Sequence, residues 1–222
     1  DYCQVHGEEL QRLVAEAAQR TIQKGQAPRE TDTFGLDIDV RPLPEKVTVR
    51  CYEMEVTPRE GSPYPEVKRT DRKKTYVMPY FADFFPKRTV RFPWAYVIPV
   101  LDQELVTKLR GHGIAVEKLI EPATLEVEQF QIKELKAADR PYQGHRTNQV
   151  KGDYAIVKRE FPKGTLIVRT AQPLGNLAAY LLEPESDDGL LAWNAFDRYI
   201  TREWSRGLQT APVYKLYAPQ NL

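Results

Sequence analysis

The chain has 222 residues, and its 32 Lys and Arg nearly balance its 31 Asp and Glu, which leaves a formal net charge of +1. With 41% hydrophobic and 28% charged residues, it has the composition of an ordinary globular protein that is long enough to bury a core. No apolar run approaches the ~20 residues that span a bilayer, and the chain lacks the cationic surplus that nucleic-acid phosphates require. We therefore expect no membrane span and no nucleic-acid partner.

The first predicted element is an amphipathic helix from Glu8 to Lys24. Gly7 can precede its first turn and Gly25 can end its last. Its apolar residues recur at i, i+3 and i+4 spacing and form one stripe, made of Leu10, Leu13, Val14, Ala17, Ala18 and Ile22. A single amphipathic helix cannot bury its own stripe, so this helix needs a partner surface.

A β-rich stretch follows the helix. Alternating apolar residues predict strands over 34–40 and 47–56, and a polar segment with Pro and Gly predicts a loop over 58–65. A third strand is expected over 75–81, where Pro79 restricts it to a sheet edge or an early end.

The next segment predicts a strand, a helix and a strand. Residues 95–98 are short and apolar, Asp102 can cap a helix that ends at Gly111 and Gly113, and residues 114–119 resume as a strand. Such a unit favours a right-handed crossover between parallel neighbours.

Further strands are predicted towards the C-terminus. A long strand with a bulge is expected over 125–132, because the apolar alternation changes phase within it. Strands over 154–161 and 165–169 flank a Pro-Lys-Gly turn and predict a hairpin.

Two helices complete the predicted elements. Pro173 opens a helix whose stripe consists of Leu174, Leu177, Ala178, Leu181 and Leu182. Ser186 is expected to cap a last helix that ends at Tyr199 or Ile200. The whole pattern predicts an α+β chain with a β-rich N-terminal half and a smaller mixed α/β unit.

We expect three parts in this chain: a linker helix in residues 1–30, a β-rich segment in 31–92 and a mixed α/β segment in 93–222. Cys3 and Cys51 form no CxxC pair, and the sequence leaves open whether they form a disulfide.

His6 and Glu9 form an HxxE pattern that can hold Zn²⁺ when folding supplies a third ligand, for which His112 and His145 are the candidates. Such an ion would polarise a carbonyl and activate water, and a self-contained zinc hydrolase is one interpretation. The pattern favours another, because Glu9 lies in the first turn of a surface helix, where acids oppose the helix dipole. We therefore predict no metal ligand, cofactor or catalytic residue in this chain.

Carboxylates cluster between residues 183 and 188, at Glu183, Glu185, Asp187 and Asp188. They admit a calcium site or an acid/base pair. A helix start with Ser186 as its N-cap is the favoured interpretation.

The stretch from Lys68 to Arg91 mixes Lys and Arg with Tyr and Phe. It predicts either a Lys-protected edge strand with a docking loop or a site for an anionic polymer such as cell-wall glycan. With Trp94 and a loop histidine added, the expected docking or binding surface consists of Lys73, Lys74, Tyr76, Tyr80, Lys87, Arg88, Trp94, His145 and Arg146.

Several motifs together carry a resemblance to a known family. They are Tyr96-Val97-Ile98-Pro99, Leu109-Arg110-Gly111-His112-Gly113-Ile114, Val116-Glu117-Lys118-Leu119, Phe161-Pro162-Lys163-Gly164-Thr165, Gln172-Pro173-Leu174 and the run from Leu181 to Leu190. These segments resemble the region that follows the catalytic domain in large bacterial zinc carboxypeptidases of the carboxypeptidase A-like class. The helix from Glu8 and the strands of 34–56 are similar to the linker and first strands that follow the peptidase fold there, so the resemblance covers most of the chain.

In that family the HxxE pair, a distant His, a substrate-carboxylate Arg and a general-base Glu lie upstream of the matched region, so the resemblance assigns none of these roles to His6 or Glu9. It implies a non-catalytic accessory C-terminal region of a secreted or periplasmic zinc metallocarboxypeptidase, which supports proteolysis by packing on or gating the catalytic domain. It also implies that the zinc belongs to a catalytic domain expected before Asp1. That domain and the peptide substrate are the expected partners.

Overall fold

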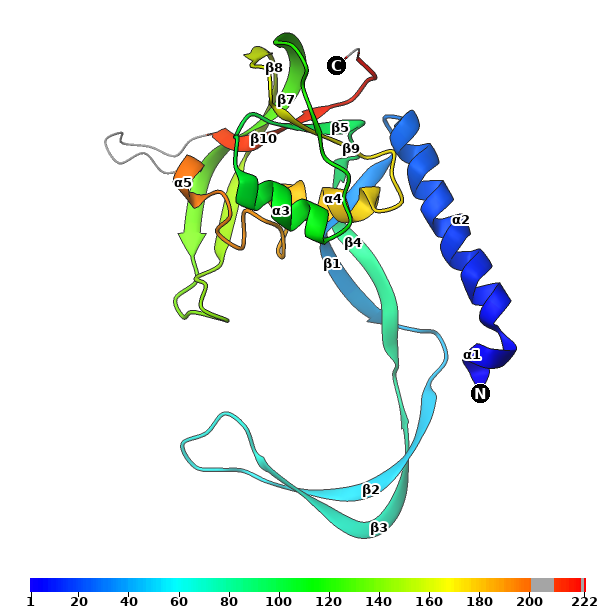
Figure 1. The fold of residues 1–222 in the computed structure, drawn as a ribbon. Coiled ribbons are helices and arrows are strands. Elements are labelled where there is room, and N and C mark those ends of the chain that lie inside the picture. The colour runs from blue at the N-terminus through cyan, green and yellow to red at the C-terminus, as the bar shows by residue number, and fades with distance from the viewer. Residues whose placement is uncertain (201–209, 221) are drawn as a thin grey trace. The chain divides into compact units, whose positions relative to one another are not determined.

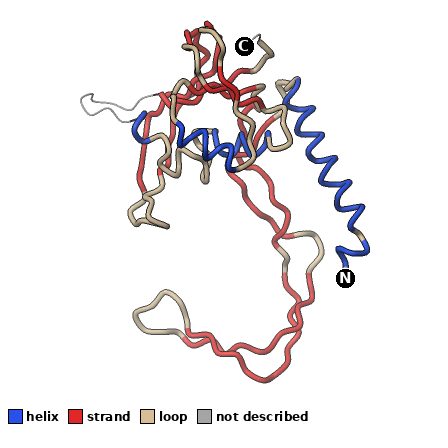
Figure 2. The backbone as a smooth tube through the Cα atoms, in the orientation of Figure 1, coloured by secondary structure: helices blue, strands red, loops and turns tan. Residues whose placement is uncertain are grey.

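The computed structural model describes residues 1–200, 210–220 and 222. Within these ranges ten strands hold 44% of the residues and five helices hold 21%, which confirms the predicted α+β class and its β-rich N-terminal half (Figure 2). No helix in these ranges has both the length and the apolar character that crossing a membrane requires.

The chain forms two compact units. The first contains residues 1–37 and 88–222, and the second contains residues 38–87. The chain leaves and re-enters the first unit along β1 (Thr33–Pro42) and β4 (Phe81–Arg91), which pair in a two-stranded sheet.

The second unit is mainly a long antiparallel ribbon (Figure 1). It pairs β2 (Val47–Thr57) with β3 (Glu66–Met78), with a register shift between Tyr52 and Met54. No residue of β2 or β3 is buried. The strand predicted over 75–81 is present only as residues 75–78, the end of β3, and it ends before Pro79 as that proline allowed. β3 itself begins earlier, at Glu66, and Phe81 belongs to β4.

The first unit, called the sheet unit below, is built on a six-stranded sheet in the order β6-β9-β5-β10-β7-β8. Every strand pair in this sheet is antiparallel. Its strands are β5 (Ala95–Ile98), β6 (Glu117–Lys118), β7 (Ala123–Ala137), β8 (Asn148–Phe161), β9 (Leu166–Arg169) and β10 (Thr210–Leu216). β10 is central and almost wholly buried. No strand was predicted over these residues.

Two apolar clusters fill the core of the first unit. The larger joins Tyr96 and Phe130 to residues of α3 (Gln103–Gly111) and α4 (Gly175–Leu182), which therefore cover the same face of the sheet (Figure 1). The smaller cluster includes Trp94, Val97, Leu125, Phe161 and Tyr214. These clusters explain why the sheet strands contain buried residues of both phases.

The apolar residues of β7 are buried on one face of the sheet in its first half and on the other face in its second half. Leu125 and Val127 belong to the smaller cluster, whereas Phe130 and Ile132 belong to the larger one. The pairing with β8 is regular through all four residues, and the register shifts only between Ile132 and Glu134. The predicted long strand is confirmed, but the bulge expected between its two phases is wrong, because the register shifts only after Ile132. The phase change comes instead from burial on opposite faces.

The strand-helix-strand segment has its predicted helix but a different topology. The Asp102 carboxylate accepts hydrogen bonds from the backbone N–H groups of Glu104 and Leu105, at 2.9 and 3.3 Å, as an N-cap. However, β9 lies between β5 and β6 and pairs antiparallel with both. The prediction of parallel neighbours is therefore wrong.

The predicted hairpin over 154–169 is also wrong, although its turn is present. Thr165 N–H donates to the Pro162 carbonyl at 3.2 Å, and Gly164 adopts a φ of 88°. β8 pairs with β7, while β9 pairs with β5 and β6. The turn residues determine a chain reversal, but the core determines which strands pair.

The long last helix predicted after Ser186 is absent. Residues 183–196 form turns, and α5 is only Asp197–Ile200. Leu190, Leu191 and Ala192 are consecutive and all buried, which a one-faced helix cannot provide. The segment instead packs on β8, where Asn148 N–H donates to the Ala192 carbonyl at 2.9 Å.

The predicted N-terminal helix is confirmed as α2 (Gly7–Gln26), preceded by the short α1 (Tyr2–Val5). Only its last turns pack closely on the rest of the first unit: Thr21 and Gly25 are buried, and Lys24 Nζ donates to Asn176 Oδ1 at 2.8 Å. Further towards the N-terminus its apolar stripe is open, with Leu10 39%, Leu13 45% and Val14 70% exposed.

The docking of α2 gives a testable prediction. A methyl group added at Gly25 would fall on the backbone of Thr170 and Ala171, so Gly25→Ala should lower the unfolding free energy by about 1–3 kcal/mol. Gly7→Ala is the matched control, because a methyl group there has no neighbour within 4 Å. Urea titrations of the two variants measure the difference, and equal stability would contradict this docking.

Candidate functional site

The predicted docking surface is divided between the two units. Lys73, Lys74, Tyr76, Tyr80 and Lys87 belong to the unit of residues 38–87. Arg88, Trp94, His145 and Arg146 belong to the sheet unit. The nine residues therefore occur as smaller groups, and each group has its own surroundings.

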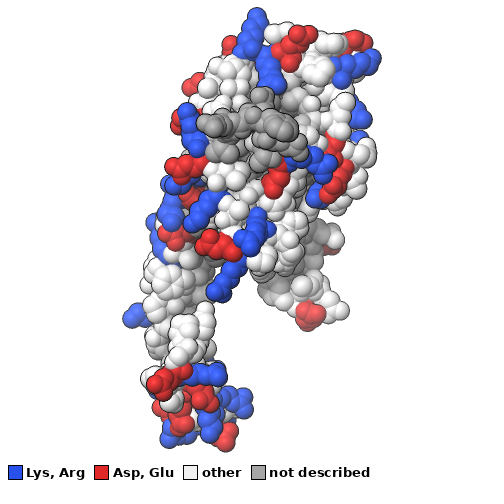
Figure 3. Space-filling model, turned by 90° about the vertical axis from the view of Figure 1, so that its left-hand side faces the viewer, with Lys and Arg blue, Asp and Glu red and all other residues white. Residues whose placement is uncertain are grey.

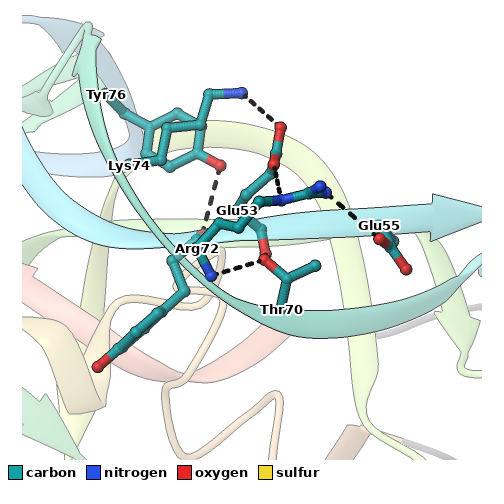
Figure 4. Close-up of polar contacts among 7 residues, drawn as sticks. Glu53, Glu55, Thr70, Arg72, Lys74 and Tyr76 are labelled. Atoms are coloured by element: carbon teal, nitrogen blue, oxygen red, sulfur yellow. Dashed lines mark hydrogen bonds and ion pairs between the residues drawn. The ribbon is translucent and has the colours of Figure 1, made fainter.

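In the ribbon, acidic residues neutralise part of the basic stretch (Figure 4). Arg72 pairs with Glu53 at 2.7 Å and with Glu55 at 3.4 Å, and Lys74 pairs with Glu53 at 3.4 Å. Beside them, the Tyr76 hydroxyl donates to the Tyr52 carbonyl at 3.4 Å. Acidic and basic side chains also intermingle over the face drawn in Figure 3. This mixture weakens the positive field that an anionic polymer would meet.

The residues of the predicted surface that belong to the sheet unit are buried or form contacts with other residues of that unit. Trp94 is only 6% exposed, and the Arg169 guanidinium lies 4.6 Å from its ring centroid. In the connection between β7 and β8, His145 Nδ1 lies 3.2 Å from Asn194 Oδ1. Arg146 donates to the Asp139 carbonyl at 3.2 Å.

His6 and Glu9 meet each other at the start of α2. His6 Nδ1 lies 3.3 Å from Glu9 Oε2, and both side chains are well exposed. Among the described residues, no group of three or more His, Cys, Asp and Glu side chains is arranged to hold a metal ion. Cys3 and Cys51 are unpaired thiols.

A buried polar site surrounds Glu183, the residue that directly follows α4. Its carboxylate is fully buried and accepts a hydrogen bond from the Tyr96 hydroxyl on β5 at 2.7 Å. The Tyr154 hydroxyl on β8 and Lys215 Nζ on β10 each lie 3.4 Å from its second oxygen. Glu183 therefore ends α4 inside the core, and the interpretation of the 183–188 carboxylates as a helix start capped by Ser186 is wrong, because no helix begins there.

Lys215 links Glu183 to a second carboxylate. Its Nζ atom lies 2.8 Å from Glu128 Oε2, and its side chain is 4% exposed. The Tyr217 hydroxyl donates to the same Glu128 oxygen at 2.6 Å. Lys215 also lies 4.0 Å from the centroid of the Tyr154 ring, which adds a cation–π contact.

The environment sets the protonation of this cluster. Burial raises the pKa of Glu183, and the nearby Lys215 ammonium and Tyr96 hydroxyl partly oppose that rise. Burial also raises the pKa values of Tyr96, Tyr154 and Tyr217, and the neighbouring carboxylates raise them further. The three tyrosines are therefore neutral hydrogen-bond donors, and the cluster can hold charge in a fixed arrangement.

A cavity of about 320 Å³ opens beside this cluster. Lys215, Glu128, Tyr154 and Tyr217 line one part of it, and Arg88, Arg91 and Glu185 line another. A larger hollow of about 820 Å³ shares Arg88, Gly152 and Glu185 with it, so the two adjoin across the Arg88–Glu185 ion pair. Of the predicted surface, only Arg88 lines either cavity.

One sequence signal for this site exists in the unassigned C-terminal segment. Lys215 stands inside the run Val213-Tyr214-Lys215-Leu216, where a strand would bury it. A Lys in such a run requires a buried partner. The identity of that partner follows only from the sheet order, which brings β10 and the end of α4 together.

Comparisons with protein-family models, with curated proteins and with solved structures found no match to this chain.

The raised pKa of Glu183 predicts a pH effect on stability. The folded chain retains a proton on Glu183 at pH values above 4.5, where the unfolded chain has released it. The stability contributed by this group is therefore fully present below pH 4.5 and is lost as the pH rises through the raised pKa. Relative to Glu183→Gln, the unaltered chain should lose stability as the pH rises above 4.5. Urea titrations followed by tryptophan fluorescence measure this, and parallel pH profiles would contradict it.

Removing the shared cation should be more damaging. Lys215→Met leaves Glu128 and Glu183 facing each other without compensation, so we expect a loss of about 3–5 kcal/mol in unfolding free energy. Lys151→Met is the matched control, because Lys151 pairs with Glu134 on the surface, where both side chains are at least 70% exposed. Similar unfolding midpoints for the two variants would show that the buried pairing is unimportant.

Proposed function

We propose that this chain is a non-catalytic accessory region of a secreted or periplasmic bacterial zinc metallocarboxypeptidase. Its role is to support proteolysis by packing on or gating the catalytic domain, which supplies the zinc and the hydrolytic residues. The family is suggested by the resemblance of residues 96–119 and 161–193 to post-catalytic regions of such enzymes.

The observation that supports a packing role is the open stripe of α2. Leu10, Leu13 and Val14 lie on one side of the helix and remain substantially exposed within the described structure. Burying a large aliphatic side chain contributes about 1.5–3 kcal/mol. Covering these residues would therefore stabilise a complex by several kcal/mol, which suits a domain–domain contact.

The position of α2 supports the same role. Its last turns are attached to the sheet unit through Thr21, Lys24 and Gly25, whereas the stripe nearer the N-terminus extends beyond that attachment (Figure 1). A catalytic domain that covers the stripe would thus be held by a helix with a fixed direction relative to the sheet.

The proposal predicts a direct interaction. A separately produced catalytic domain of a large bacterial carboxypeptidase of this class should form a one-to-one complex with the chain in sedimentation velocity. Leu13→Glu combined with Val14→Glu should abolish the complex, because it places two charges in the apolar contact. Gln19→Glu, which adds a charge on the opposite side of α2, should leave the complex intact. Equal binding by both variants would exclude α2 as the contact.

A second experiment separates this proposal from a self-contained zinc hydrolase. The chain, purified without chelator, should contain no stoichiometric zinc and should release no C-terminal residue from a peptide when zinc is added. One zinc per chain that is lost in His6→Ala, together with peptide hydrolysis, would overturn the accessory role.

A further inference from the structure

The cavity beside Lys215 contains both cations and carboxylates. Arg88, Arg91 and Lys215 contribute positive charge, and Glu128 and Glu185 contribute negative charge. Two of the cations already have carboxylate partners: Lys215 lies 2.8 Å from Glu128, and Arg88 lies 2.7 Å from Glu185. Their positions are therefore largely fixed before any ligand arrives.

Arg91 differs from the other two cations. Its guanidinium lies 4.2 Å from the centroid of the Tyr217 ring, which fixes its plane. Its Nε atom is buried and has no hydrogen-bond partner among the described residues. Arg91 also forms no ion pair with any Asp or Glu among the described residues. A buried donor of this kind is costly unless a ligand accepts its hydrogen bond, and a guanidinium binds a carboxylate through two parallel hydrogen bonds.

The closest contacts of the two carboxylates in the cavity wall are each made through one oxygen. Glu128 binds Lys215 and Tyr217 through Oε2, and Glu185 binds Arg88 through Oε2. These contacts are made to one oxygen of each carboxylate, and an ionised carboxylate accepts hydrogen bonds through both of its oxygens. The Glu185 side chain is only 8% exposed, so its second oxygen has limited access to water. These oxygens suit a cationic donor such as an ammonium group.

We propose that this cavity binds a free α-amino acid, with its carboxylate on Arg91 and its ammonium on Glu185 and Glu128. Its volume of about 320 Å³ lies at the lower end of the range for small-molecule sites. The two carboxylates in the wall repel a doubly charged phosphate, whereas a zwitterion meets both signs of charge. The site lies within one unit and does not rest on the proposed accessory role.

The first test uses the whole chain and ligands that differ in one charge. L-Leucine, titrated to about 20 mM so that a site of millimolar affinity is saturated, should shift backbone amide NMR signals of residues around the cavity. N-Acetyl-L-leucine lacks the ammonium and L-leucinamide lacks the carboxylate, so each should bind at least about tenfold more weakly. Absence of shifts with leucine, glycine and phenylalanine would overturn the proposal. So would equal binding of either blocked analogue or preferential binding of inorganic phosphate.

The second test uses variants. Arg91→Gln and Glu185→Gln should each weaken L-leucine binding by about ten- to a hundredfold, the effect of losing a charge-assisted hydrogen bond. Arg69→Gln is the matched control, because Arg69 also stacks on a tyrosine, Tyr52, at 4.6 Å but lies in the other unit. Unchanged binding by Arg91→Gln would overturn the assignment. If that variant does not fold, the blocked analogues on the unaltered chain still decide the question.

Discussion

The sheet unit depends on one buried ion-pair network, in which Lys215 lies between Glu183 and Glu128. Glu183 ends α4, Lys215 lies on the central strand β10, and Glu128 lies on β7 beside it. Charges removed from water are tolerated only when their partners are placed correctly. The network therefore requires the end of α4 to meet β10 at one register, and it also forms the wall of the cavity that Arg91 completes.

The parts of this fold that follow from local pattern were predictable from the sequence. The stripe of α2, the Asp102 cap of α3 and the turn at Pro162–Gly164 all depend on residues within a few positions of one another. Strand partners were not predictable in this way. β9 pairs with β5 and β6 because the core clusters bring them together, although the turn places β9 directly after β8 in the chain.

The candidate site escaped prediction for a related physical reason. Its members Tyr96, Glu128, Glu183 and Lys215 lie on four separate elements and share no motif or spacing. Each is ordinary by itself: Glu183 precedes a proline near other acids, and Lys215 lies in a short segment near the C-terminus. The basic stretch from Lys68 to Arg91 predicted a binding surface instead, because its charges are adjacent in sequence. Adjacency in sequence shows where charge is dense, whereas a binding site also requires burial.

The same ion-pair chemistry has different consequences in the two units. In the ribbon, Arg72 and Lys74 pair with glutamates in contact with water, where each pair contributes little and both side chains remain free to exchange partners. In the sheet unit, Lys215 and Glu183 are buried, so their geometry is fixed and removing one leaves the other uncompensated. A ligand that meets fixed charges loses less free energy to ordering them. For this reason the cavity beside Lys215 is better suited to selective binding of a small molecule than the more basic ribbon.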